Sequence, residues 1–432
     1  MKGNMLRINI LLVMILAFAG MAGFRPCMAQ SLSELSYEDA RQALHSHSAL
    51  AENPQMLKEI SSLAIKNIDN TWLPQISLNA QATWQSDVTH VQIPLPSLQM
   101  PEMPKDQYRV SAEISQLLYN GQASKYRRNL EELQLEASTL DVEIQMDMLE
   151  QQMDALIFQI LGLRRQAKIL QWQKEALQAR LKTCEKRMEN GMSTPGSCAL
   201  IEANIVQVEQ KQTETRFTYA SALQQLRLLT GLPLGDSVHV ALPGYEPPLD
   251  NQEYNRKDLK LFGVQQKMSE IKSEWAKARL QPTAAAFLNA GYGRPGLNML
   301  DPDFKPFLLT GVRLTLPLLQ WNTPQHEAEI ARQQARLVAN QQKNLLQQLD
   351  RKKAEIEAEM ARLQETLKGD QQLVQLRQQV SSEARSQYEN GVITASEVSA
   401  RLAEEAEARL TLEMHSLMLD YAKLKAYKLI NN

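Results

Sequence analysis

Residues 76–85 read Ile-Ser-Leu-Asn-Ala-Gln-Ala-Thr-Trp-Gln, and apolar and polar side chains alternate strictly along this stretch. Because successive side chains of a β-strand point to opposite faces of the sheet, the alternation predicts a strand with one apolar and one polar face. Similar runs occur at 108–115, 286–293 and 308–316. We therefore expect four strands in two hairpins. The alternation by itself fits an outer-membrane barrel and an antiparallel sheet in water equally well.

Long helices are predicted by the two segments that contain no proline, 105–194 and 325–432. Within both, apolar residues recur at spacings of four and three, which is typical of helices packed in coiled-coil fashion. A helix from about Ala123 to Glu189 would be roughly 100 Å long at about 1.5 Å per residue. The sequence thus predicts an α+β fold that is mostly α.

Two matching turns indicate an internal duplication. Glu-Asn-Gly-Met-Ser-Thr at 189–194 returns as Glu-Asn-Gly-Val-Ile-Thr at 389–394, 200 residues later. In each turn Asn-Gly ends one helix through a left-handed residue, and the threonine can cap the helix that follows. The turn residues are Asn190, Gly191 and Thr194 in the first half and Asn390, Gly391 and Thr394 in the second.

The N-terminus predicts export. Lys2 and Arg7 precede an apolar run at 8–24, and small residues before Gln30 suit cleavage, so 1–29 is expected to be a signal peptide. A membrane anchor and lipidation of Cys27 stay open as alternatives. No run of eighteen apolar residues follows residue 30, so any membrane crossing would have to be made by strands. The 47 basic and 49 acidic residues give no indication of nucleic-acid binding.

Several short motifs in a fixed order carry a resemblance to a known family. They are Leu-Ser-Tyr-Glu-Asp-Ala at 35–40, Asn-Pro at 53–54, Leu-Pro-Gln at 73–75, Leu-Tyr-Asn-Gly at 118–121 and Leu-Leu-Thr-Gly-Leu-Pro-Leu-Gly at 228–235. With them the chain resembles the TolC-like outer-membrane efflux proteins, or outer membrane factors, over essentially its whole mature length. The resemblance implies a homotrimer in the outer membrane of a Gram-negative bacterium.

The same resemblance implies the architecture and the partners. Four strands from each chain would complete a 12-stranded transmembrane β-barrel, continuous with a long periplasmic α-helical barrel. Such proteins are passive exit ducts, joined by a periplasmic adaptor (membrane fusion protein) to an inner-membrane pump of RND or ABC type. The strands also favour a multimer independently, because an open sheet edge in lipid leaves backbone groups unsatisfied. Three copies, unlike two, would leave room for a channel.

We expect the chain to be organised in four segments. Residues 1–29 are the signal peptide, and 30–227 form the first repeat, with a β-hairpin at 74–118 and a helical tip near 190–196. Residues 228–250 connect the halves at an equatorial level. Residues 251–432 form the second repeat, with a β-hairpin at 282–317 and a tip near 390–396.

Functional residues are expected at the tips, at a gate and in the barrel. The resemblance makes both Asn-Gly turns adaptor-docking points, although each is also simply a helix-ending turn. It aligns Glu397 and Tyr388 with a periplasmic gate, while Ala400, Ser197 and Ile393 replace other gate residues, so the lock must differ. Glu397 could equally be a glutamate that complements a helix dipole. The polar strand faces, including Arg109, Glu113 and Arg313, would line the barrel lumen.

Cys184 and Cys198 each lie seven residues from Gly191, on the two sides of the first turn. In an oxidising periplasm they could form a disulfide that closes the helical hairpin, or they could remain two buried thiols.

The sequence gives little support to an enzyme, a cofactor or a metal site. His326-Glu327 lacks the second histidine of a metalloprotease motif, and the glycine-rich stretch at 291–296 is not followed by a predicted helix. The leading function is therefore an outer-membrane exit duct for efflux or type I secretion. The alternative is a soluble periplasmic coiled-coil scaffold. The cargo and the pump class stay open.

Overall fold

The computed structural model describes residues 32–88, 103–242, 244 and 253–431. The predicted signal peptide, with Cys27, lies outside these residues. The chain divides into two compact units. We call Met1–Ser48, Gln152–Gly244 and Asp370–Leu417 the tip unit, because it contains both Asn-Gly turns. We call Ala49–Gln151, Tyr245–Gly369 and Met418–Asn432 the sheet unit.

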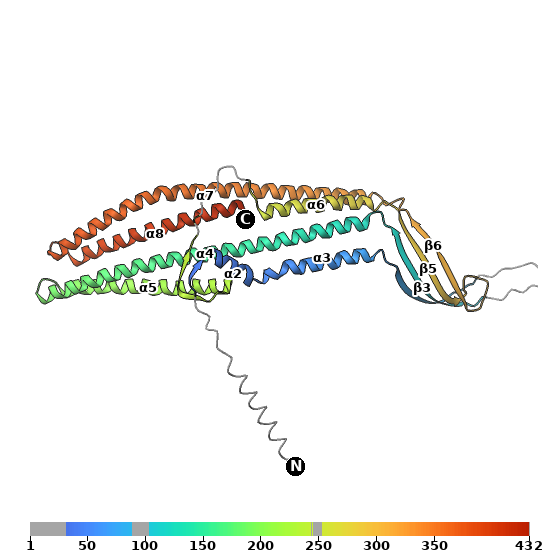
Figure 1. Ribbon diagram of the computed structural model, residues 1–432, viewed down its shortest axis with the longest axis horizontal. Helices are drawn as coiled ribbons and strands as arrows, with labels where there is room; N and C mark the ends of the chain where they lie inside the picture. Colours follow the sequence, from blue (N-terminus) through green and yellow to red (C-terminus); the bar gives the residue numbers. More distant parts are fainter. Residues whose placement is uncertain (1–31, 89–102, 243, 245–252, 432) are drawn as a thin grey trace, which may run out of the picture. The chain divides into compact units, whose positions relative to one another are not determined.

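The sheet unit contains all four strands that the alternation predicts. They are β2 (Gln75–Trp84), β3 (Asp106–Tyr119), β5 (Thr283–Arg294) and β6 (Lys305–Thr315). The strands form one antiparallel sheet in the order β2-β3-β5-β6, so that β2 and β6 lie at its two edges (Figure 1). The prediction of four antiparallel strands is thereby confirmed.

The strand register gathers the apolar residues on one face. Leu78 lies opposite Ala112, Ala112 opposite Ala290, and Ala290 opposite Leu308. Cross-strand partners share a face, and the side-chain period of a strand is two. Even-numbered positions of the four strands therefore share this face, up to the register shift between Leu117 and Tyr119 in β3.

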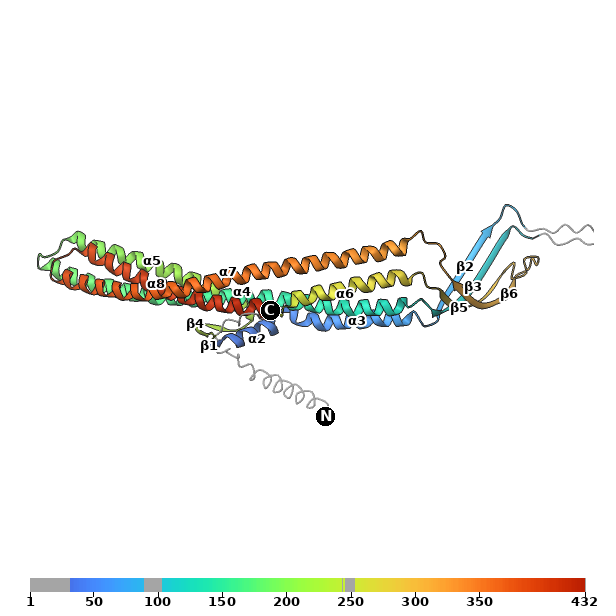
Figure 2. The same ribbon diagram turned by 90° about the horizontal axis from the view of Figure 1, so that it is seen from above.

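The helices of the sheet unit include η1 (Ala49–Glu52), α3 (Asn53–Asn70) and α6 (Lys257–Ala278). α3 starts with a proline in its first turn, a position where the missing N–H costs nothing. In Figure 2, α3 and α6 lead to the sheet, as do the parts of α4 and α7 that belong to this unit. Ile356 and Met360 of α7 pack with Ala422 and Ala426 near the end of α8.

The tip unit contains the turn ends of two helical hairpins, whose helices α4, α7 and α8 continue into the sheet unit. α4 (Ala123–Glu189) turns into α5 (Pro195–Thr230), and α7 (Thr323–Glu389) turns into α8 (Ala395–Asn431). The bounds of α4 confirm the predicted helix. The core of the unit includes the 4-3 seam residues Leu170 and Leu177 of α4, together with Ile201 of α5 and Leu402 of α8. Hydrophobic burial along this seam joins the two hairpins.

A small second sheet lies in the tip unit and was missed by the sequence analysis. β1 (Leu32–Ser36) pairs in parallel with β4 (Leu234–Ala241), next to α2 (Tyr37–His47). β4 lies within the segment 228–250 that we expected only to connect the halves. Arg164 of α4 donates to the carbonyl of Val238 at 3.1 Å, which ties this sheet to the long helix.

The element order repeats along the chain. A helix, two strands, a 67-residue helix and a returning helix occur as α3-β2-β3-α4-α5 and again as α6-β5-β6-α7-α8. Among the described residues, no helix is both long enough and apolar enough to cross a membrane.

Candidate functional site

The first turn ends α4 and starts α5. Gly191 has a φ of +70°, a left-handed conformation that glycine adopts without strain. The Met192 N–H donates to the Arg187 carbonyl at 2.8 Å and so satisfies one of the last free carbonyls of α4. Thr194 caps α5 by accepting a hydrogen bond from the Ser197 N–H at 3.3 Å.

The second turn uses the same backbone geometry between α7 and α8. Gly391 has a φ of +77°, and the Val392 N–H donates to the Gln387 carbonyl at 2.8 Å. Its cap is more complete, because Thr394 accepts from the Glu397 N–H at 3.2 Å while Glu397 Oε2 accepts from the Thr394 N–H at 2.8 Å. This reciprocal pair is a capping box.

Both turns present an exposed apolar side chain directly after the glycine. Met192 is 63% exposed and Val392 is 71% exposed. The Asn190, Thr194, Asn390 and Thr394 side chains around them are also exposed. The asparagines, glycines and threonines of the turns were predicted from the sequence, whereas these two apolar residues were not. Their matching positions, 200 residues apart, are the signal that could have identified them.

Glu397 lies in an environment that favours its charge. Its carboxylate accepts hydrogen bonds from the backbone N–H of Thr394 and from the Thr394 hydroxyl, and these bonds lower its pKa below the usual value. The side chain is fully exposed. The geometry makes Glu397 part of a helix cap, whereas we had considered a glutamate that complements the helix dipole. The gate role stays a prediction.

Tyr388 is buried, at 5% exposure, and its environment reveals a residue that the sequence analysis missed. The Arg187 guanidinium of α4 donates to the Tyr388 carbonyl and lies 5.0 Å from the centre of the Tyr388 ring. Arg187 therefore places a cation at the C-terminal end of α7, where the helix dipole is negative. Within the described part of the chain, the Tyr388 hydroxyl has no hydrogen-bond partner.

Cys184 and Cys198 are joined as a disulfide across the first hairpin, with their Cα atoms 5.7 Å apart. Both belong to the core of the tip unit, and so do Ala384 and Val398, the residues 200 positions later. The first hairpin thus has a covalent bond at the position where the second has only an alanine packed near a valine. Whether the bond forms in the secreted protein stays a prediction.

Arg180 is a buried cation near these turns. It is 9% exposed, and burial lowers its pKa, followed by the positive charge of Arg385. The carboxylates of Glu405 and Glu389 act in the opposite direction. Arg180 donates to the Val398 carbonyl at 3.4 Å, so it links α4 to the first turn of α8.

In the sheet unit, the structure brings Arg109, Glu113 and Arg313 to one face of the sheet, opposite the apolar one. Glu113 lies opposite Ser77, and Arg313 lies opposite Ala285. The Arg109 guanidinium lies 5.4 Å from the centre of the Phe307 ring, and that of Arg313 lies 5.2 Å from Phe287. These contacts hold both arginines along the sheet.

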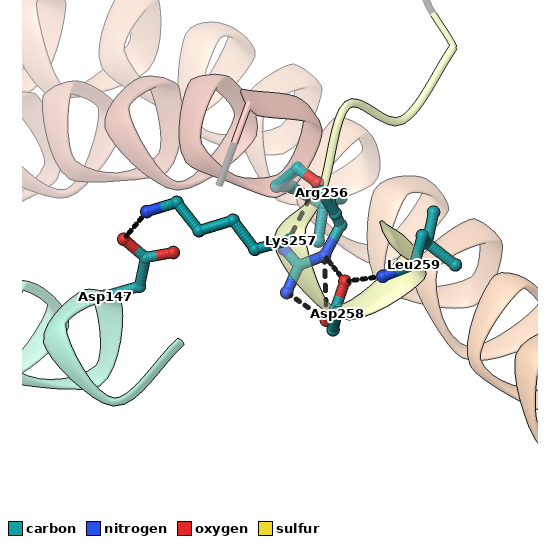
Figure 3. A network of polar contacts seen from close by, with 6 residues as sticks. Asp147, Arg256, Lys257, Asp258 and Leu259 are labelled. Atoms are coloured by element: carbon teal, nitrogen blue, oxygen red, sulfur yellow. Dashed lines mark hydrogen bonds and ion pairs between the residues drawn. The ribbon is translucent and has the colours of Figure 1, made fainter. Parts of the chain in front are cut away.

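Two ion pairs with buried carboxylates in the sheet unit were also missed, and Figure 3 shows the first of them, between Asp147 and Lys257. Asp147 of α4 is buried and pairs with Lys257 at the start of α6, at 2.7 Å. Glu150, one turn further along α4, pairs with Lys428 near the end of α8 at 3.2 Å. Two acidic residues three apart on one helix thus fix the ends of two other helices, since a buried carboxylate requires a partner.

No group of three or more His, Cys, Asp or Glu side chains in the described ranges is arranged to hold a metal ion. The candidate site therefore consists of surfaces: two exposed turns, one exposed apolar sheet face, and one polar sheet face.

Comparisons with known proteins show which proteins share this architecture. Residues 40–232 match the model of the family described as outer membrane efflux protein. The sequence matches none of the curated proteins. The fold is similar to VceC of Vibrio cholerae, with 16% identity, a TM-score of 0.69, and coverage of 92% of this chain and 96% of that chain.

Two further channels share the fold. CmeC of Campylobacter jejuni is 12% identical with a TM-score of 0.66, covering 91% of this chain and 85% of that one. The open state of MtrE of Neisseria gonorrhoeae is 15% identical with a TM-score of 0.62, covering 92% and 89%. The resemblance stated from the sequence is confirmed by the family match over residues 40–232 and by the fold that the chain shares with these proteins.

Proposed function

We propose that this protein is an outer-membrane efflux protein that serves as the passive exit duct of a tripartite efflux or type I secretion system. It would receive substrates from a periplasmic adaptor and an inner-membrane pump of RND or ABC type, and release them outside a Gram-negative cell. Such a duct has no catalytic step, and its function depends on which surfaces face lipid, water, sister copies and partners.

The observation that carries the proposal is the exposed apolar face of the four-stranded sheet. Leu78 is 76% exposed, Val312 67% and Leu314 69%, and the register places them on one face. A contiguous apolar surface of this kind is rare on proteins that stay in water. Strands of about ten residues with an apolar outer face suit a barrel wall in lipid.

Closure of the barrel requires other copies. β2 and β6 are edge strands within the chain, and open edges in hydrocarbon leave backbone groups without partners. α3 precedes β2 and exposes Ile60 at 63%, while α7 follows β6 and exposes Leu337 at 61%. Each edge therefore continues into a helix with exposed apolar residues. A homotrimer would join these edges into twelve strands and leave a channel.

The polar face of the sheet would then line the channel, with Arg109, Glu113 and Arg313 in contact with water. The two similar halves of the chain, as internal repeats, would each supply two strands and one helical hairpin to the wall. Around a threefold axis, three copies of Glu397 and Tyr388 would surround the periplasmic opening. Carboxylates arranged in a ring attract cations, as in other channel constrictions.

The two Asn-Gly turns would dock the adaptor. They are exposed, and each presents one apolar side chain, Met192 or Val392, surrounded by polar groups. Apolar anchors with a polar rim are the common arrangement of protein interfaces.

The test compares two neighbouring residues that lie on opposite sheet faces. In cells, the Leu78→Cys and Ser77→Cys variants are each spin-labelled at the new cysteine. The collision rates of each spin label with oxygen and with a water-soluble nickel chelate are then measured. We expect the label at 78 to be accessible to oxygen, as in acyl chains, and the label at 77 to the chelate. If both labels collide mainly with the chelate, and the protein is released by osmotic shock, the soluble periplasmic scaffold replaces the duct.

A second measurement tests the assembly. The purified protein in neutral detergent should have the mass of three chains, and it should conduct ions in planar bilayers. A monomer or dimer without conductance would contradict the closed barrel.

A further inference from the structure

A cleft in the tip unit has features that neither the duct nor the turns use. It lies between α4, α7 and α8 and has a volume of about 560 Å³. Cavities of roughly 300–1,000 Å³ are typical of sites for small organic molecules. Arg165, Lys168, Ile169 and Trp172 line it from α4. Their spacing of three and four places them on one face of that helix.

The floor of the cleft is apolar. Val374 of α7 and Leu412 of α8 line it together with Ile169 and the Trp172 ring. All four are only partly buried, so the structure leaves some of their apolar surface open to a ligand. An indole ring provides a flat surface on which a planar or aliphatic body can pack.

Three basic residues and one acidic residue, Glu413, line the cleft, so its formal charge is positive. Arg409 lies over Trp172, with its guanidinium carbon 4.7 Å from the ring centre, and Glu405 accepts two hydrogen bonds from it at 3.0 and 2.7 Å. Arg165 is paired with Glu413 at 3.1 Å. Lys168 is exposed and has no ion pair or hydrogen bond within the residues that the structure describes.

The three basic side chains of the cleft therefore differ in whether a carboxylate pairs with them. Arg165 and Arg409 are each engaged by one carboxylate of α8, whereas the Lys168 ammonium carries an uncompensated charge at the edge of an apolar floor. An ammonium group offers three hydrogen-bond donors and no acceptor. The complementary ligand has an apolar body and one negatively charged head.

We propose that this cleft binds an amphipathic organic anion, such as an aromatic or aliphatic carboxylate or sulfonate. The body packs on Trp172, Ile169 and Leu412, and the head lies against Lys168. This site is separate from the docking turns and does not depend on the duct function, because it is formed entirely within the tip unit.

The experiment uses a matched pair of probes on the full chain in neutral detergent. Naphthalene-2-sulfonate carries the charge, and naphthalene-2-sulfonamide is its neutral analogue with the same ring. Isothermal titration should give one saturable site per chain for the sulfonate, weaker binding of the sulfonamide, and a loss of sulfonate affinity as salt rises, since salt screens an exposed pair.

Two variants separate the head from the body. Lys168→Gln should weaken sulfonate binding about fivefold and leave sulfonamide binding unchanged. Trp172→Leu should weaken both probes by a similar factor, because it removes the aromatic floor. Lys182→Gln, an exposed lysine on the same helix outside the cleft, is the control and should bind like the wild type.

Three results would overturn the proposal. They are equal sulfonate affinity in the Lys168→Gln and Lys182→Gln variants, equal affinity of the wild type for both probes, and no saturable binding to the wild type. The proposed duct would survive all three, because it is tested separately by the accessibility of the spin labels and by conductance.

Discussion

The turn at Gly191 and the turn at Gly391 have nearly the same backbone but are held by different side chains. Both glycines are left-handed, and both following N–H groups donate to a carbonyl in the last turn of the preceding helix. The hydrogen bonds that a helix end requires are therefore met in the same way twice. The stability of each turn beyond that depends on side chains alone.

The first hairpin is closed by the covalent bond between Cys184 and Cys198, and the second has Ala384 and Val398 at the same places. An alanine and a valine in a core contribute hydrophobic burial but do not restrict the unfolded chain as a cross-link does. We infer that the second hairpin opens more easily than the first. If the tube opens at its periplasmic end, α7 and α8 are the helices expected to move.

The largest expected effect comes from making the first hairpin like the second. The double variant Cys184→Ala with Cys198→Val should lower the local opening free energy of the first turn by about 3 kcal/mol, because the bond closes a loop of about 15 residues. Hydrogen exchange of the amides between residues 184 and 198 measures this, with the amides of 384–398 as internal control.

Peptide mapping of freshly secreted protein must come first. A linked peptide pair under non-reducing conditions is expected, whereas free thiols at both cysteines would remove the basis of the comparison. Unchanged exchange in the double variant would show that burial alone holds the first turn.

The reverse change should have a somewhat smaller effect. Ala384→Cys with Val398→Cys should form a disulfide in the periplasm and slow exchange at the second turn, by up to about 2 kcal/mol, since engineered bonds deliver less than native ones. If α7 and α8 open the tube, this variant should also conduct less than the wild type in planar bilayers. Reduction should restore the conductance; equal conductance before and after reduction would exclude movement of these helices.

The predicted and the missed elements show which parts of the fold a local sequence pattern can predict. The alternation at 76–85 predicted β2, and the missing prolines predicted α4, because both signals lie within the element that they describe. β1 and β4 were missed because their pairing joins residues about 200 positions apart, and a five-residue strand has too short a pattern. Long-range parallel pairing has no local signature.

At the two Asn-Gly turns, too, only features set by neighbouring residues could be predicted from the sequence. The glycines and threonines of both turns were predicted, since a turn is set by adjacent residues. Arg187 was missed, because its partner is the carbonyl of Tyr388, 201 positions later. The only sequence signal for Arg187 was its position in the last turn of a helix, where a basic side chain favours the negative end of the helix dipole. The resemblance directed attention to Tyr388 but supplied no partner for it.

Arg187 provides the next test, because position 387 of the second hairpin is glutamine. Arg187→Gln should remove the charged hydrogen bond to the Tyr388 carbonyl and the contact with its ring, at a cost of about 1–2 kcal/mol. The two hairpins would then separate more often, and conductance in planar bilayers should rise. Lys186→Gln, which removes the neighbouring charge, is the control; an equal rise in both variants would assign the effect to net charge.

The smallest effect is expected from the caps, where Glu397 in the second turn corresponds to Ser197 in the first. Hydrogen bonds from Thr394 lower the pKa of Glu397, so the ionised carboxylate favours the folded turn. This contribution is complete above the unfolded pKa of about 4.3 and is lost as the pH falls through the lower folded value. Hydrogen exchange at the second turn should therefore be faster in Glu397→Gln than in the wild type at neutral pH. The difference should disappear in acid, where both side chains are uncharged.

Ser197→Glu should create the matching capping box and slow exchange at the first turn, again only above the pKa of the carboxyl group. If Glu397→Gln instead changes the preference of the channel for cations while exchange at the turn is unaltered, the carboxylate acts as part of a ring around the opening. Such a result would reject the helix cap as its main role, because a cap acts on its own turn and requires no neighbouring chain.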